Sequence, residues 1–256
     1  MRPTDARADR RRGALRTALR DRDAACSDRV HRPASATMSP AVTVGIVACA
    51  AYLIGSLPFA YTIVRAVTGE DITDHGTGNI GAMNVRRTTG SWAWFIVAMS
   101  ADILKGFVPV LLAGTAVQAL GGADALIIPA RQAAIAGTVL GHNYSLWMAI
   151  KKHRFTRTGK GLATGGGALL AYDWRYAVTV VIVGLIFIAV TKYMMAGQVA
   201  GALTLPVVAL VLRSPDWPFA LAMGLVVYAA HHKRFIGMLQ GREPKFYIAD
   251  RMGPRG

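Results

Sequence analysis

The chain has 256 residues, of which 53% are hydrophobic and only 17% are charged, and its mean hydropathy is positive at +0.36. Soluble domains carry about 25% charged residues, so this composition excludes an ordinary soluble globular protein. The net charge of +15 on its own suggests a nucleic-acid-binding protein, but the distribution of the charges along the chain argues against that class.

Residues 1–38 form the first distinct segment. They contain ten arginines and five aspartates and no apolar core, a composition typical of disorder, and no hydrophobic region follows the arginines closely enough for a signal peptide. Two interpretations stay open: an Arg-rich tail that favours a cytoplasmic N-terminus, or an over-extended gene start upstream of Met38. We expect a membrane domain over residues 39–248 and a C-terminal tail over residues 249–256.

Apolar blocks of a length suited to crossing a bilayer, about 20 residues, make up most of the remaining chain. They predict an all-α, polytopic integral membrane protein with about seven transmembrane helices, although two blocks are short for a full span. The predicted blocks are Val42–Val67, Trp92–Leu120, Ala125–Ile150, Leu162–Tyr172, Tyr176–Thr191, Tyr193–Leu212 and Trp217–Ala230.

Basic residues gather in the loops between these blocks, as in KKHRFTRTGK (151–160) and HHKRF (231–235). Such loops predict the cytoplasmic side of a membrane and attract anionic lipid or substrate. We therefore expect a multi-pass protein of the cell membrane, with these loops facing the cytoplasm, and no nucleic-acid partner. For Lys151 and Lys152 a topology signal is favoured over a site. Cys26 and Cys49 indicate neither a disulfide framework nor a zinc site.

The first polar loop, TGEDITDHGTGNIGAMNVRRTT (68–89), carries Gly76, Gly78 and Gly81 with the spacing G-x-G-x-x-G. A dinucleotide site with this spacing needs a preceding buried strand, a following amphipathic helix and an acidic residue about 20 positions further on. Here the preceding stretch is EDITDH, and an apolar membrane block follows. The dinucleotide interpretation therefore fails.

Glycine-rich loops also bind phosphate through backbone N–H groups, which approach an anion closely where no side chain intervenes. In the first loop Thr77, Asn79 and Asn84 add side-chain donors, and Arg86 or Arg87 can bind phosphate in a bidentate manner. A second loop, TRTGKGLATGGG (156–167), adds Lys160; it is not a P-loop, because Gly161 follows the lysine where Ser or Thr is required. Two such loops predict one or two substrates that carry phosphate.

Several polar residues allow two interpretations. Asp102 and Lys105 lie inside an apolar block, where charges are expensive and usually functional, but their spacing lets them pair on one helix face. For Gly165–Gly167 helix packing is favoured over phosphate binding. His142 ends an apolar block, so a site role is plausible, whereas His231 and His232 are expected mainly at the membrane interface.

The polar motifs, in their order along the chain, resemble those of the acyl-phosphate:glycerol-3-phosphate acyltransferase (PlsY) family. The stretch YLIGSLPFAY resembles the family's first aromatic run, and GTGNIGAMNVRR resembles G-S-G-N-x-G-A-T-N-x-x-R. DILKG is similar to D-x-x-K-G, GHNYS to G-H-x-x-P, and GKGLAT to G-K-G-V-A-T; GRE, near the end of the chain, resembles the last motif. The similarity covers roughly residues 51–246.

This resemblance implies seven membrane helices and transfer of a fatty acyl group from acyl phosphate to the 1-hydroxyl of glycerol 3-phosphate, without metal, cofactor or acyl-enzyme. The products would be lysophosphatidate and phosphate, and the enzyme that makes acyl phosphate would be a functional partner. The resemblance implies catalytic roles for Thr77, Arg87, Lys160 and His232. It implies phosphate or substrate binding by Gly76, Gly78, Asn79, Gly81, Asn84, His142, Arg157, Gly159 and Gly161.

The chain departs from the family pattern at specific positions. Met83 and Ser145 replace a threonine and a proline, and the stretch before Gly159 is longer and more charged, so that Arg157 takes the place of the family lysine. If His232 matches the last motif's histidine, Phe235 replaces an asparagine.

Two rival hypotheses follow: a catalytically weakened or re-purposed family member, and a small-anion transporter. No internal repeat of the kind found in transporters is evident, and no histidine has an aspartate five residues later, as the other main acyltransferase class requires.

Overall fold

The computed structural model describes residues 38–76 and 78–242. The predicted N-terminal tail (1–38) apart from Met38, the predicted C-terminal tail (249–256) and Thr77 lie outside the described residues. Every regular element in the described part is helical, in agreement with the predicted all-α class. In chain order the elements are α2 (Pro40–Gly55), α3 (Phe59–Thr68), the 3-10 helix η1 (Ile72–Asp74), α4 (Ala82–Thr89), α5 (Trp92–Ala119), the 3-10 helix η2 (Asp124–Leu126), α6 (Ile127–Asn143), α7 (Leu146–Lys152), α8 (Leu162–Tyr172), α9 (Trp174–Thr191), α10 (Met194–Val211) and α11 (Trp217–Leu239).

Among the described residues, four helical segments are long and apolar enough to cross a membrane: Pro40–Thr68, Trp92–Ala119, Trp174–Thr191 and Met194–Val211. Two shorter apolar helices cover Leu162–Tyr172 and Trp217–Ala229. Many large apolar side chains on these helices are exposed, among them Leu185, Val190 and Leu210, as expected for surfaces that face lipid tails. The membrane character is confirmed, while the count of about seven spans stays a prediction.

Two of the predicted blocks are interrupted. The first, Val42–Val67, divides into α2 and α3 at residues 56–58, where Pro58 lacks the N–H that would continue the helical ladder. The third, Ala125–Ile150, was predicted as one block but divides into α6 and α7, because the chain turns out of helical geometry at Tyr144 (φ −132°, ψ 72°). The Ser145 hydroxyl then accepts a hydrogen bond from the Met148 N–H and begins α7.

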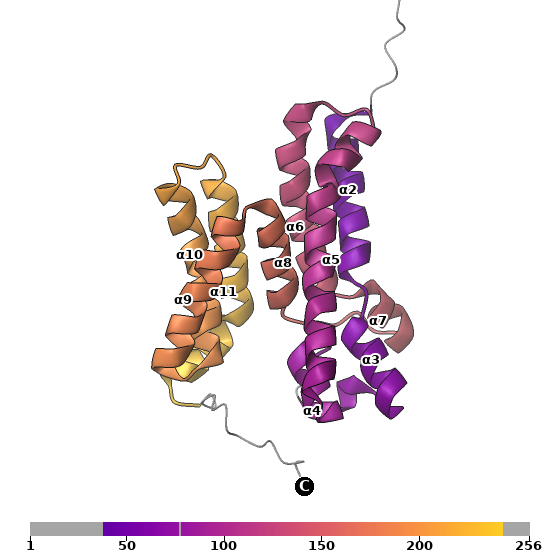
Figure 1. Cartoon of the computed structure of the whole chain (residues 1–256), viewed down its shortest axis with the longest axis vertical. Helices are drawn as coiled ribbons and strands as arrows, with labels where there is room; N and C mark the ends of the chain where they lie inside the picture. The colour runs from indigo at the N-terminus through magenta and orange to yellow at the C-terminus, as the bar shows by residue number, and fades with distance from the viewer. Residues whose placement is uncertain (1–37, 77, 243–256) are drawn as a thin grey trace, which may run out of the picture. The chain divides into compact units, whose positions relative to one another are not determined.

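Glycines bring the helices of the first part of the chain into close contact. α2 packs along α6, and α5 packs along α8 (Figure 1). A Cβ added at Gly137 or Gly141 would collide with the α2 backbone, and one added at Gly106 would overlap the Thr164 carbonyl oxygen. Close backbone approach at small residues is the usual way in which membrane helices associate. Val47, Val110 and Ala134 lie in the apolar core that these helices share.

The last three helices pack on one another in sequence, α9 on α10 and α10 on α11. Gly197 on α10 approaches the Gly184 carbonyl of α9 so closely that a Cβ there would overlap it. Tyr176, Leu205 and Ala220 supply one buried side chain from each helix to a shared apolar cluster.

Gly166 and Gly167, neighbours on α8, provide a test of this packing. A Cβ at Gly167 would overlap the Ile103 carbonyl oxygen of α5, whereas a Cβ at Gly166 meets nothing within 4 Å. We expect Gly167→Ala to destabilise the protein by about 1–3 kcal/mol, because the two backbones must separate. Gly166→Ala should be neutral or slightly stabilising, because alanine is the better helix former. Thermal unfolding in detergent micelles measures both; equal midpoints for the two variants would contradict the close α5–α8 contact.

Candidate active site

The first glycine-rich loop connects η1 to α4 and is organised by a buried amide. Asn84, on the first turn of α4, is 1% exposed, and its Nδ2 lies 3.0–3.1 Å from the carbonyl oxygens of Ile72, His75 and Asn79. One side chain therefore contacts three separate points of the loop. The sequence predicts Asn84 as a phosphate ligand, and the geometry gives its Nδ2 a clear second role, that of fixing the path of the loop backbone.

Two of the predicted loop glycines have backbone conformations that other residues rarely adopt. Gly76 and Gly78 have φ values of +56° and +69°, in the left-handed region that favours glycine. Gly76 also has no room for a side chain, because an added Cβ would overlap Asn84 Oδ1. Gly81 differs from these two: it has an extended backbone (φ −118°) and is the N-cap residue of α4.

The two arginines of α4 point to different neighbours. The guanidinium of Arg86 stacks over the ring of Trp92 at 3.9 Å from its centroid. The Cδ of Arg87 lies 3.4 Å from the Cβ position of Gly76, so this side chain runs beside the first loop and is half-buried. Of the two alternatives that the sequence leaves open for phosphate binding, Arg87 is the one adjacent to the loop.

The second glycine-rich loop joins α7 to α8. Thr158 is its buried anchor: its N–H donates to the Asn143 carbonyl (2.7 Å), and its hydroxyl donates to the His142 carbonyl (2.9 Å). The exposed Arg157 donates from Nε to the Gly159 carbonyl at 3.0 Å. Lys160 is half-buried, and Gly161, with φ +70°, is the N-cap residue of α8.

A backbone hydrogen bond joins the two loops. The N–H of Ile80 donates to the carbonyl of Thr158 at 2.9 Å, across 78 residues of sequence. Both loops lead directly into helices, α4 and α8. Helix N-termini present unpaired N–H groups and a positive dipole end, which favour phosphate, so the arrangement suits an anionic ligand.

An ion pair fastens α7 to the beginning of the first loop. Lys152 Nζ, on the last turn of α7, lies 2.5 Å from Asp71 Oδ2, and Asp71 also accepts hydrogen bonds from Thr73. Burial raises the pKa of the Asp71 carboxyl, but the hydrogen bonds from Lys152 and Thr73 outweigh that effect and lower the pKa to about 2. The carboxylate is therefore ionised at neutral pH, and the ion pair persists there.

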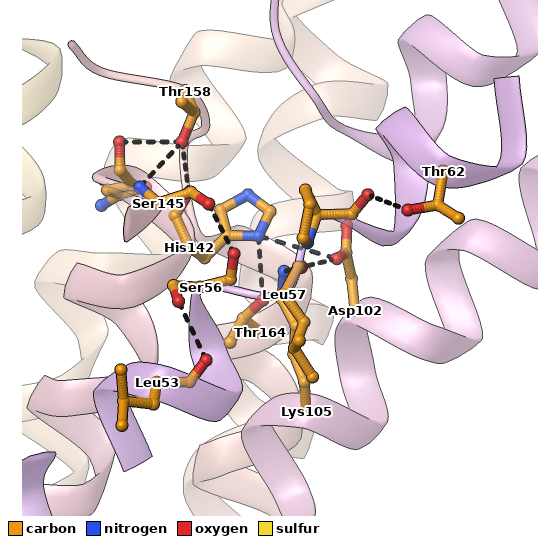
Figure 2. A network of polar contacts seen from close by, with 12 residues as sticks. Leu53, Ser56, Leu57, Thr62, Asp102, Lys105, His142, Ser145, Thr158 and Thr164 are labelled. Atoms are coloured by element: carbon orange, nitrogen blue, oxygen red, sulfur yellow. Dashed lines mark hydrogen bonds and ion pairs between the residues drawn. The ribbon is translucent and has the colours of Figure 1, made fainter. Parts of the chain in front are cut away.

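A buried polar network lies where α5, α6 and α8 meet (Figure 2). His142, at the end of α6, is 4% exposed, and its Nδ1 lies 3.3 Å from the Thr164 hydroxyl and 3.7 Å from Asp102 Oδ1. Lys105 Nζ lies 2.9 Å from the same Asp102 oxygen. The pairing of Asp102 with Lys105 is confirmed, and the geometry adds His142 to it.

Sequence reasoning missed the hydroxyls that complete this network. Ser145 Oγ donates to the Ser56 carbonyl at the α2–α3 break (2.5 Å), and the Ser145 N–H donates to the Thr158 hydroxyl. Single serines and threonines carry no spacing signal of their own, so the pattern does not reveal these contacts. Their effect is to tie the α2–α3 break, the α6–α7 break and the second loop together.

The predicted residues near the C-terminus do not join this group through any described hydrogen bond. His232 Nδ1 lies 2.7 Å from the Ala229 carbonyl oxygen of its own helix, α11. Phe235 packs edge-on against Tyr228, with ring centroids 6.2 Å apart. The catalytic role implied for His232 thus stays a prediction.

Comparison with known proteins identifies the family. The family described as glycerol-3-phosphate acyltransferase matches residues 45–241 of this chain. The chain belongs to this family. A Thermus thermophilus protein named glycerol-3-phosphate acyltransferase is 36% identical over 198 residues, which cover 75% of this chain and 90% of the relative. A Rhodospirillum rubrum protein of the same name is 30% identical over 221 residues, which cover 85% of this chain and 98% of the relative.

Solved structures agree with this assignment. The crystal structure of PlsY, described as an integral membrane glycerol 3-phosphate acyltransferase in its glycerol 3-phosphate form, matches with a TM-score of 0.65 and 27% identity. The match covers 80% of this chain and 96% of that one. The lysophosphatidic acid form matches with the same TM-score, 26% identity and 95% coverage of its chain. The family resemblance inferred from the motifs is therefore confirmed.

Ser145 stands where the glycerol-3-phosphate acyltransferase motif has proline, and the structure explains how the chain accommodates the change. Its hydroxyl caps α7 and also bonds to the Ser56 carbonyl. A serine at a helix N-cap replaces the conformational restriction of proline by a hydrogen bond. These two hydrogen bonds of Ser145 stabilise the turn between α6 and α7.

The role of Asn84 as an organiser of the first loop can be measured by hydrogen exchange. We expect Asn84→Ala to raise amide exchange in residues 72–81 by about tenfold or more, because three loop carbonyls lose a shared buried donor. Thr88→Ala is the matched control, since the Thr88 hydroxyl bonds only the Asn84 main-chain carbonyl of its own helix in the described contacts. Unchanged exchange in the Asn84 variant would refute this role.

Proposed function

We propose that the protein transfers a fatty acyl group from acyl phosphate to the 1-hydroxyl of glycerol 3-phosphate, giving lysophosphatidate and inorganic phosphate for phospholipid synthesis. Family membership supports acyl transfer to glycerol 3-phosphate. The observation that carries the proposal is the hydrogen bond between Ile80 and Thr158, which holds two glycine-rich loops together. Two such loops suit a reaction in which both substrates carry phosphate.

The reaction is an acyl transfer between oxygens. The 1-hydroxyl oxygen attacks the acyl carbon, the bond from that carbon to the phosphate oxygen breaks, and phosphate leaves with the bonding electrons. The hydroxyl proton passes to a phosphate oxygen, so the atoms and charges balance. Because an acyl phosphate is already activated, binding the two substrates side by side supplies much of the rate enhancement.

In this proposal the cationic side chains stabilise the charge that develops on the leaving phosphate. Lys160 lies in the second loop and Arg87 beside the first, and both are half-buried, so their charges act in surroundings of lower dielectric than water. Backbone N–H groups of Gly76 and Gly161 are assigned to the phosphate oxygens, whereas the Gly78 N–H donates to the His75 carbonyl at 2.9 Å and shapes the loop. His142 is assigned a structural part in the second loop.

The remaining predicted residues keep their proposed assignments. Thr77, Asn79 and Gly81 contribute to the shared phosphate site from the first loop, and Arg157 and Gly159 contribute to it from the second loop. His232 is proposed to reach the site from α11.

We further propose that the protein lies in the cell membrane with both loops at the cytoplasmic face. The basic stretch 151–160 between α7 and α8 supports this orientation. Cytoplasmic loops give direct access to water-soluble glycerol 3-phosphate. The acyl phosphate is supplied by an enzyme that makes it, which is the functional partner in this proposal.

One observation favours a second candidate function, a re-purposed acyltransferase with a different acceptor. If His232 matches the histidine of the family's last motif, Phe235 takes the place of an asparagine, and its ring packs against Tyr228 rather than offering a polar group. A pocket that loses one hydrogen bond to a substrate weakens binding by about 1–3 kcal/mol. Acceptor affinity is the quantity that separates the two candidates.

The direct test supplies full-length protein in detergent with glycerol 3-phosphate and either palmitoyl phosphate or palmitoyl-CoA. We expect lysophosphatidate from palmitoyl phosphate alone. Lys160→Ala should lower the rate at least tenfold, because a charge-assisted contact to phosphate is worth about 1.5–3 kcal/mol. Arg154→Ala removes an exposed cation from the same connection between α7 and α8 and should leave the rate unchanged.

The outcomes separate the candidates. No product from either donor would refute the proposed reaction. Product that appears only with an acceptor other than glycerol 3-phosphate would favour the re-purposed enzyme. Equal losses in the Lys160 and Arg154 variants would show that general surface charge, rather than the second loop, sets the rate.

A further inference from the structure

Asp102 and Lys105 are buried charges for which the proposed reaction has no use. Their side chains are 3% and 2% exposed, inside the membrane-spanning helix α5. Charges at such positions are costly and therefore generally functional. They lie one turn apart on α5 and pair at 2.9 Å, so their mutual neutralisation is the simplest explanation for their presence.

The contacts of this pair extend beyond the pair itself. Lys105 Nζ also donates to the Leu57 carbonyl at the α2–α3 break, 3.0 Å away. Asp102 Oδ1 lies 3.7 Å from His142 Nδ1, and the Thr164 hydroxyl lies 3.3 Å from the same nitrogen. Figure 2 shows the imidazole of His142 between Asp102 on one side and the segment with Thr158 on the other.

The opposite edge of the His142 ring faces the second glycine-rich loop. A Cβ added at Gly159 would overlap His142 Nε2, so Gly159 is in contact with this nitrogen and only glycine fits. Thr158, the preceding residue, bonds to the His142 main-chain carbonyl as well. The ring therefore spans from a carboxylate on α5 to the backbone that carries Lys160.

We propose that Asp102 is a positioning residue for the second glycine-rich loop and acts through His142. A carboxylate beside Nδ1 favours the tautomer with the proton on Nδ1, which leaves Nε2, the nitrogen in contact with Gly159, without a proton. Lys105 balances the charge of the carboxylate and holds it in place. The inference rests on the proposed function only in taking the second loop as a phosphate site.

The first measurement is the tautomer of His142 in full-length protein. Nitrogen chemical shifts of ¹⁵N-histidine-labelled protein in micelles distinguish a proton on Nδ1 from one on Nε2, and the signal missing from His142→Gln identifies residue 142. We expect the proton on Nδ1 at pH 8. A proton on Nε2 in the wild-type protein would overturn the proposal, whatever the variants do.

The second measurement is the affinity for inorganic phosphate, followed by ³¹P NMR titration. Asp102→Asn alone leaves Lys105 as a buried unpaired charge and is expected to unfold readily, so the informative variant is Asp102→Asn combined with Lys105→Met. We expect this double variant to fold, to bind phosphate about tenfold more weakly and to lose the preference for Nδ1. Wild-type affinity together with an unchanged tautomer would overturn the proposal, as would a wild-type protein that does not bind phosphate.

Asp216→Asn is the matched control. Asp216 Oδ1 accepts a hydrogen bond from Gln132 of α6 at 3.0 Å, so this substitution makes the same chemical change at another interhelical contact. It should lower the thermal midpoint without moving the phosphate affinity or the His142 tautomer. A purely structural role for Asp102 predicts the same behaviour for both variants. If acyl transfer fails while phosphate binding responds as expected, the proposed reaction is rejected and this inference stands.

Discussion

The close contact between α5 and α8 decides where the proposed site residues lie. At Gly106 and Gly167 the two backbones approach until no Cβ fits on either side, and this brings Asp102 of α5 within one polar network with Thr164 of α8. Membrane helices gain little from burying apolar surface, since lipid tails are equally apolar, so they depend on such small-residue contacts. The loop before α8 is thereby held next to the end of α6, where Thr158 bonds to the His142 and Asn143 carbonyls. A bulkier residue at either glycine would push the two helices apart, and with them the polar residues of the network on α5 and α8.

A second constraint explains the contacts of the buried donors Lys105, Ser145 and Thr158. Main-chain carbonyls left free at helix breaks must find donors, because no water is available in the apolar region. At the α2–α3 break Lys105 and Ser145 supply these donors to Leu57 and Ser56. At the α6–α7 break Thr158 does so for His142 and Asn143. The stabilised breaks in turn support the proposed site. Its two loops are joined by a hydrogen bond between Ile80 and Thr158, which lie 78 positions apart in the sequence.

Much of this architecture is predictable from sequence pattern, and the exceptions have physical causes. Long apolar blocks predict the helices well, because length and composition suffice for a membrane span. The division of Ala125–Ile150 at Tyr144 escapes prediction, since no proline or charge marks it and tertiary bonds from Thr158 stabilise the turn. Glycine spacing predicts two phosphate loops. It does not predict their pairing through Ile80 and Thr158, which depends on packing between distant segments, nor the use of the Asn84 amide to fix three loop carbonyls.

The central claim is that the two glycine-rich loops form one phosphate site. An experimental structure of the full-length protein with glycerol 3-phosphate bound tests it most directly. The account predicts phosphate oxygens within hydrogen-bonding distance of backbone N–H groups in both loops, around Gly76 and Gly161, with Lys160 or Arg87 in contact. A phosphate bound to one loop alone, with the Ile80–Thr158 hydrogen bond broken, or bound away from both loops, would contradict it.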